Sequence, residues 1–110
     1  MNTVSSSFRQ RLPNRRPSQV FEITVAGLRY TASFSRFADG RLGELFLSNH
    51  KSNSAADTNA RDSAITFSIA VQCGADPEVI RKALSRDSQG RATGPLGTAL
   101  DHIATWGSSC

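Results

Sequence analysis

Apolar residues alternate with polar ones along the first half of the chain. Residues 20–25 place three apolar side chains at every second position, namely Phe21, Ile23 and Val25. Ala26-Gly27 follows as a tight turn. The alternation resumes over residues 28–34, where one face consists of Leu28, Tyr30, Ala32 and Phe34. These two segments predict an antiparallel hairpin with one buried face.

A third strand is expected over residues 42–48. The dipeptide Asp39-Gly40 gives the turn before it. The strand contains the continuous apolar run Leu45–Leu47, which is typical of a strand covered on both sides. We therefore expect a second covering surface there, which an adjoining subunit would provide.

The spacing of apolar and small residues changes in the second half of the chain. From about residue 59 to residue 73, a set of mostly apolar or small residues recurs at intervals of three and four, namely Ala64, Ile65, Ser68, Ile69 and Gln72. This spacing predicts a helix with a small-residue face, and Gly74 is the expected stop signal. Cys73 is expected to be a buried small hydrophobe near its end.

Two further helices are expected after this one. Asp76-Pro77-Glu78 places an acid at the N-cap and proline in the first turn, which begins a short helix. Its buried side consists of Ile80, Ala83 and Leu84. Residues 85–93 are a polar loop, and a last helix then begins at Gly94-Pro95 and ends by Gly107. Its inward residues are Leu96, Ala99, Leu100 and Ile103.

These elements predict an α+β fold, with an N-terminal antiparallel sheet of three to four strands followed by three helices packed on one face. The chain has 110 residues, which is enough for one domain. We expect a basic flexible arm over residues 1–18, a single α+β domain over 19–107 and a short tail over 108–110. No stretch is apolar enough to span a bilayer and the first residues lack the apolar core of a secretory signal, so a cytoplasmic protein with free thiols is expected.

The net charge of +4 belongs to the arm. Residues 1–18 contain no acid and four basic residues, Arg9, Arg11, Arg15 and Arg16. The rest of the chain holds nine basic and nine acidic residues and is therefore balanced. Such an arm is suited to nucleic-acid phosphates or to a protein partner. The alternative is an arm that docks on its own domain or on a neighbouring subunit.

An anion site is the second candidate. Lys51, Ser52 and Ser54 precede the first long helix, and Arg61 lies in its first turns. Free N–H groups at a helix N-terminus, together with lysine, hydroxyl and guanidinium donors, favour a phosphate. The alternative is a loop that only caps the helix, with Arg61 paired to Asp57 or Asp62. Two further cations, Arg36 and Arg41, flank the Asp39-Gly40 turn and either join this site or bracket a solvated hairpin.

No catalytic or metal-binding arrangement is visible in the sequence. His50 lies in a polar loop, and neighbouring residues on a helix do not face each other, so Asp101-His102 is not a dyad. Both histidines are expected on the surface. Two cysteines far apart, Cys73 and Cys110, form neither a metal pattern nor a disulfide framework. We therefore expect a protein that is not an enzyme and holds no cofactor or metal.

The order of these residues resembles the TSCPD-type domain, which occurs at the C-terminal end of adenosylcobalamin-dependent ribonucleotide reductases and as small stand-alone relatives. The resemblance covers about residues 20–85. It consists of the stretch Asp39–Leu47, then Lys51-Ser52, the helical run Ser68-Ile69-Ala70, Gly74, and the proline-started segment Pro77–Ile80. The segments 11–16 and 94–101 are similar to parts of stand-alone relatives. The Thr-Ser-Cys-Pro-Asp motif is absent, and the glycines of the family's lysine loop are replaced.

The resemblance implies an accessory α+β module, not a reductase by itself. We expect a binding module that forms homo-oligomers and holds a nucleotide, another phosphate-bearing ligand or a partner protein. Its ligand site would consist of Lys51, Ser52, Ser54 and Arg61, with Arg36 and Arg41 nearby. The alternative is a nucleic-acid-associated or inhibitory protein of a mobile element that acts through the arm.

Overall fold

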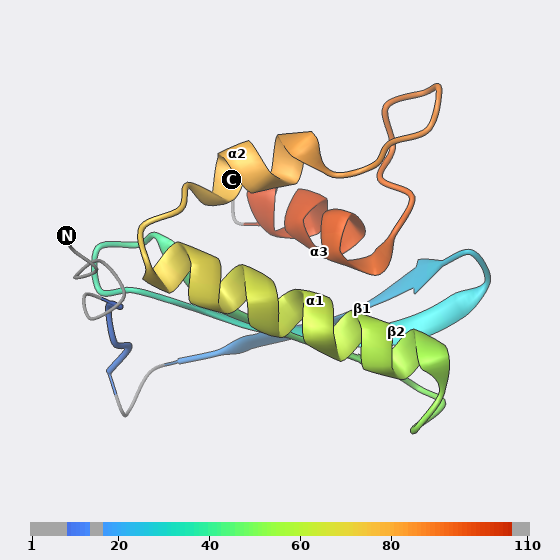
Figure 1. Cartoon of the computed structure of the whole chain (residues 1–110), viewed down its shortest axis with the longest axis horizontal. Coiled ribbons are helices and arrows are strands. Elements are labelled where there is room, and N and C mark those ends of the chain that lie inside the picture. The colour runs from blue at the N-terminus through green and yellow to red at the C-terminus, as the bar shows by residue number, and fades with distance from the viewer. Residues whose placement is uncertain (1–8, 14–16, 107–110) are drawn as a thin grey trace, which may run out of the picture.

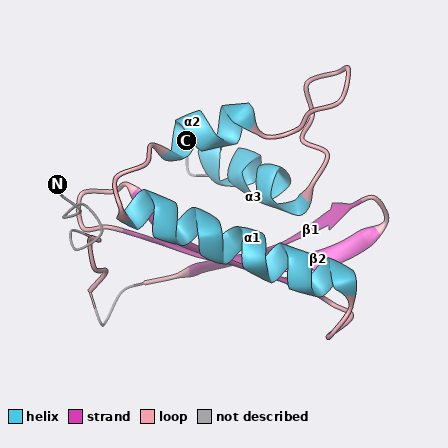
Figure 2. Ribbon diagram, in the orientation of Figure 1, coloured by secondary structure: helices cyan, strands magenta, loops and turns pink. Residues whose placement is uncertain are grey.

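The computed structural model describes residues 9–13 and 17–106. Three antiparallel strands come first, in the spatial order β1 (Gln19–Val25), β2 (Leu28–Arg36) and β3 (Leu42–Asn49). Three helices follow, α1 (Ala55–Gln72), α2 (Pro77–Ala83) and α3 (Pro95–Ala104). Figure 1 shows α1 lying along the sheet, with α3 beside it and α2 above α3. The predicted α+β class is confirmed, and Figure 2 shows the helices together on one side of the strands.

The β1–β2 hairpin has a two-residue loop. Ala26 and Gly27 both have positive φ, at 51° and 78°, as the primed turns that match the twist of a hairpin require. Val25 then pairs with Leu28, and the register continues to Gln19 opposite Phe34. Leu28 itself is exposed beside the turn, although the alternation placed it on the buried face.

The core lies between the inner face of the sheet and the two helices α1 and α3. Alternate strand residues enter it, and the largest fully buried side chains are Phe34 and Leu45. The helices contribute a stripe of small and apolar residues, namely Ala60, Ala64, Phe67, Val71, Ala99, Leu100 and Ile103. Helix α2 has no buried residue and packs mainly on α3.

The boundary and the buried face of α1 differ from those expected. The helix begins at Ala55, because Ser54 is its N-cap and accepts a hydrogen bond from Asp57 N at 3.0 Å. Ile65 and Ile69 are 48% and 41% exposed, so their assignment to the buried face is wrong. Phe67, which is 2% exposed, occupies the core instead. The spacing fitted either face, and contact with β3 selects the one that carries alanine and serine.

Helix α1 covers the free edge of β3 with its side chains. Ser68 Oγ accepts from Leu45 N at 2.9 Å, and its single hydroxyl hydrogen has two acceptors within reach, Leu45 O at 3.0 Å and Ala64 O at 2.8 Å. Gln72 Nε2 donates to Gly43 O at 2.8 Å, and Asp57 Oδ1 accepts from Asn49 N at 2.9 Å. An edge strand normally offers these groups to another chain. Here a helix satisfies them, which the close approach at the alanines permits.

The described residues leave the outer face of the sheet open at Phe46. Phe46 points outward and is 50% exposed, so the described residues of this chain do not cover the run Leu45–Leu47 on both sides. Coverage by an adjoining subunit stays a prediction. Cys73 is exposed at the C-cap of α1, and the expectation that it is buried is wrong.

Candidate ligand pocket

The residues predicted to bind an anion lie at opposite ends of β3. Lys51, Ser52, Ser54 and Arg61 are at the end where the strand leads into α1, and Arg36 and Arg41 are at the β2–β3 turn. An eight-residue strand separates the two groups by roughly 25 Å. The six residues therefore do not form one site.

At the N-terminus of α1, the Asp57 carboxylate already accepts several of the hydrogen bonds that an anion would need. Asp57 accepts from Asn49 N at 2.9 Å, from Asn53 N at 3.4 Å and from Arg61 Nε at 3.0 Å. These hydrogen bonds, that from Asn49 first and that from Arg61 next, lower the pKa of Asp57. Arg61 is thus paired with Asp57, which was the alternative to anion binding in the sequence analysis.

The hydroxyl of Ser54 in this loop also makes hydrogen bonds within the chain. Ser54 Oγ donates to Lys51 O at 2.8 Å and accepts from Asp57 N. Lys51 and Ser52 are exposed. An added anion here would compete with the Asp57 carboxylate for its donors.

At the other end of β3, Arg36 and Arg41 lie on aromatic rings. The Arg36 guanidinium lies 5.3 Å from the centre of the Phe34 ring, and that of Arg41 lies 4.7 Å from the centre of the Phe37 ring. Cation–π contacts of this kind hold a guanidinium in place while leaving its N–H edges accessible.

The two arginines differ in their hydrogen-bond partners. The Arg41 backbone N–H donates to Asp39 Oδ1 at 3.1 Å and Arg41 Nε donates to Asp39 Oδ2 at 2.7 Å; these two bonds, the backbone one first, hold the pKa of Asp39 below its ordinary value. Arg36 Nη1 donates to Gly40 O at 3.0 Å. No carboxylate pairs with Arg36 in the described part of the chain, so its remaining N–H groups are available.

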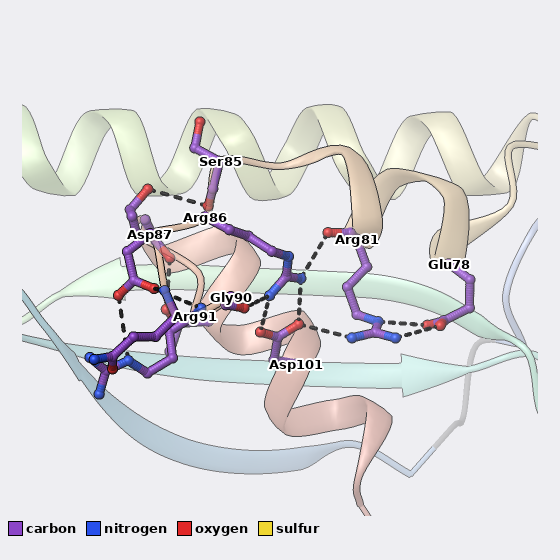
Figure 3. Close-up of polar contacts among 12 residues, drawn as sticks. Glu78, Arg81, Ser85, Arg86, Asp87, Gly90, Arg91 and Asp101 are labelled. Carbon is purple, nitrogen blue, oxygen red and sulfur yellow. Dashed lines mark hydrogen bonds and ion pairs between the residues drawn. The ribbon is translucent and has the colours of Figure 1, made fainter.

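Helices α2 and α3 bring a third arginine to this region. Arg81 binds Glu78 through Nε and Nη2 at 2.9 and 2.7 Å and Asp101 through Nη1 at 3.0 Å. Asp101 also accepts two hydrogen bonds from Arg86, both at 2.8 Å. Figure 3 shows Asp101 between the two guanidinium groups.

These contacts shift the pKa values of the whole network. The bonds to Arg86, and then those to Arg81, lower the pKa of Asp101. The bidentate hydrogen bond from Arg81 lowers the pKa of Glu78. The carboxylates of Glu78 and then of Asp101 raise the pKa of Arg81. All members therefore stay charged at neutral pH. The network joins α2 to α3 and fully occupies Arg81.

Two cavities open on either side of Arg36. The first has a volume of about 250 Å³ and lies between the β2–β3 turn and helices α2 and α3. The second, of about 420 Å³, is bounded by Phe34 and Phe37 and by Pro13 and Pro17, which precede β1. Arg36, Gly40 and Trp106 line both cavities. An unpaired cation and an indole thus lie where the two cavities meet.

Trp106 is part of an aromatic cluster under these cavities. Its ring is 5.4 Å from Phe34 in an edge-on arrangement and 5.6 Å from Phe21. His102 stacks on Phe21 with 4.2 Å between the ring centres. His102 is exposed, as expected, but the stacking on β1 was not foreseen. His50 is also exposed and lies 3.0 Å from Thr31 Oγ1.

The described part of the arm docks on its own domain. Gln10 N donates to Gln72 O at 2.6 Å and Arg9 Nε donates to Gln72 Oε1 at 2.6 Å, at the C-terminal end of α1. Leu12 packs over Gly43 so closely that a Cβ there would come within 2.9 Å of it. Arg11 is exposed, whereas Arg15 and Arg16 lie outside the described residues.

Two negative findings concern other classes of site. Within residues 9–13 and 17–106, no group of three histidine, cysteine or acidic side chains is placed to hold a metal ion. In the same residues, no helix is long and apolar enough to cross a membrane. Cys110 lies outside the described residues.

Comparison with known proteins gives a partial match. The chain is 36% identical over 66 residues to a vitamin B12-dependent ribonucleotide reductase of Agrobacterium fabrum, and 32% identical over 66 residues to one of Bradyrhizobium diazoefficiens. The chain is similar to part of a ribonucleotide reductase. The matched residues are 60% of this chain but 5% of each reductase. No protein-family model and no solved structure matches.

The similarity of the chain to a segment of these reductases agrees with the resemblance to the TSCPD-type domain. It concerns a small segment of each reductase, so it fixes a relationship and not an activity. The residues that line the two cavities were only partly foreseen. Arg36 and Arg41 were expected near a site, because they flank a turn. Arg81 and Trp106 gave no signal, because their positions depend on how α2 and α3 pack.

Proposed function

We propose that this chain is a small, non-enzymatic binding module that holds a nucleotide or another phosphate-bearing ligand beside Arg36. One observation carries the proposal: Arg36, without a carboxylate partner among the described residues, lies where two cavities meet against Trp106. Every other arginine described in the walls of these cavities is already paired with a carboxylate.

The chemistry of Arg36 and of Trp106 fits the two parts of a nucleotide. The Arg36 guanidinium presents a planar fork of N–H donors to phosphate oxygens. The indole of Trp106, which is 36% exposed, offers a surface on which a base can stack, at about 1–3 kcal/mol per base. The larger cavity, at about 420 Å³, falls within the range of small-molecule sites. The relatives are named as reductases of ribonucleotides, which supports this class of ligand.

The region at the N-terminus of α1 supports the proposal less well. Arg61 and two backbone N–H groups are bonded to Asp57, so a phosphate would have to displace a carboxylate. Lys51 remains exposed there and is the natural competitor site. The same titration can therefore decide between the two ends of β3.

Trp106 is the sole tryptophan and reports directly on the cavities. We expect its fluorescence to change on titration with ADP, with a weaker response to inorganic phosphate or adenosine alone. Arg36→Gln should weaken ADP binding about tenfold or more, because a charge-assisted hydrogen bond is lost. Arg91→Gln is the matched control, since Arg91 is exposed and lines neither cavity.

The outcomes separate three possibilities. Loss in Arg36→Gln alone supports the site. Loss in Lys51→Ala and Arg61→Ala with normal binding in Arg36→Gln would place the ligand at the N-terminus of α1. Absence of binding to all three compounds, by fluorescence and by calorimetry, would contradict the proposal.

A further inference from the structure

The hydrogen bonds between α1 and β3 show which backbone N–H and C=O groups of the two edge strands point out of the sheet. Leu45 N and O bind Ser68, so the backbone N–H and C=O groups of the odd-numbered residues of β3 point away from β2. Because hydrogen-bonded and non-hydrogen-bonded pairs alternate in an antiparallel ladder, the register carries this assignment across the sheet. The N–H and C=O groups of Val20, Glu22 and Thr24 therefore point away from β2.

The edge of β1 is unprotected along these three residues. Each is exposed, and their outward backbone groups have no partner among the described residues. Val20 is 62% exposed although it is apolar. On the other edge, side chains of α1 bind outward groups of Gly43, Leu45 and Asn49 in β3. An open edge with paired donors and acceptors is a template for another strand.

We propose that β1 pairs antiparallel with β1 of a second copy of this chain, across a two-fold axis, to form a six-stranded sheet. Such an interface uses the same surface on both copies, as most homodimers do. The inference goes beyond the proposed ligand site, which lies within one chain, and does not depend on it.

Charge selects the register of this pairing. If Glu22 lay opposite the partner's Glu22, two carboxylates would be adjacent, which is unfavourable. With Glu22 opposite the partner's Thr24, the next residue in the same row is the partner's Arg29, since Thr24 pairs with Arg29. Each Glu22 then has its own Arg29 on one side and the partner's Arg29 two strands away on the other.

The same register gives the exposed valine a place to pack. The partner's Val20 then lies beside Ala26 of the β1–β2 turn, on the outer face of the sheet that also carries Glu22 and Thr24. Ile23 faces the partner's Ile23 at the two-fold axis. The register therefore combines an apolar contact, an alternation of charges and four backbone hydrogen bonds, two for each Glu22–Thr24 pair.

The first test removes one outward N–H group. Thr24→Pro deletes a donor that β1 does not use within its own chain, and proline is tolerated on an edge strand. Thr24→Val keeps the N–H group and is the matched control. By analytical ultracentrifugation, we expect the unmodified chain and Thr24→Val to be dimers, at twice the chain mass of 11.8 kDa. Thr24→Pro should sediment as a monomer and keep the circular dichroism spectrum of the folded chain.

The second test reverses the charges and decides the question even if Thr24→Pro does not fold. Glu22→Arg should raise the dimer dissociation constant about tenfold, because it brings like charges together across the interface. Adding Arg29→Glu should restore it to within about threefold of the original value. A chain that is monomeric at every concentration, a folded Thr24→Pro dimer, or a double variant as weak as Glu22→Arg would each overturn the proposal.

Discussion

Helices α1 and α2 are held to the molecule by different interactions. Helix α1 buries apolar side chains against β3 and binds its edge largely through uncharged groups such as Ser68 and Gln72. Helix α2 has no fully buried residue: Ile80 is partly buried against the core, and the charged network around Asp101 joins the helix to α3. Burial and buried hydrogen bonds are insensitive to salt, whereas partly exposed ion pairs are screened. The stability of α1 and that of α2 should therefore respond to different changes.

The largest expected effect lies in the α1 core. Phe67→Ala should lower the free energy of unfolding by about 3–5 kcal/mol, because it leaves a cavity at a residue that is 2% exposed. Ile69→Ala, two positions along the same helix, should cost about 1 kcal/mol or less, since Ile69 is 41% exposed. Urea unfolding measures both. Equal losses would mean that the face of α1 toward β3 is misassigned.

A smaller effect is expected where α1 meets the edge of β3. Ser68→Ala should cost about 1–3 kcal/mol, because Leu45 N and O lose their buried partner. Ser63→Ala is its control, since Ser63 Oγ donates only to Ala60 O of the same helix. Thermal unfolding compares the two variants. A cost in Ser63→Ala that matches the cost in Ser68→Ala would remove the special role of the edge contact.

The smallest effect is confined to α2 and depends on pH. Because the pKa values of Asp101 and Glu78 are lowered in the folded protein, their contribution is complete above their ordinary pKa values. It is lost as the pH falls through the lower, folded-state values. Hydrogen exchange should therefore show α2 amides opening in acid or in high salt before those of α1.

Asp101→Asn sharpens this measurement. It removes the charge that holds Arg81 and Arg86, so α2 amides should exchange faster at neutral pH. Their further loss of protection in acid should be smaller than in the unmodified chain. Protection of α2 that is independent of pH, of salt and of this substitution would show that the network does not hold the helix.

Sequence patterns predicted the elements well and the contacts between them poorly. Asp76-Pro77 and Gly94-Pro95 located the starts of α2 and α3, and Ala26-Gly27 located the hairpin, because each carries a local backbone preference. Such preferences act within a few residues and need no knowledge of the rest of the fold.

The candidate pocket was harder to predict, because it depends on long-range packing. The four basic and hydroxyl residues near α1 were grouped with Arg36 and Arg41, yet a whole strand separates them. Whether a cation is free or paired also depends on distant acids, as for Arg81 with Asp101. Periodicity could not choose between the two faces of α1, since the serine at position 68 is buried for a hydrogen bond to β3.

The coverage of β3 by α1 limits how far this chain can assemble. A sheet with two open edges can add strands at both ends and grow into a filament. Here Ser68, Gln72 and Asp57 bind outward groups of β3, so among the described residues β1 is the edge left open to a further strand. A two-fold pair at β1 would end the sheet at α1 on both sides, which favours a closed dimer over a filament.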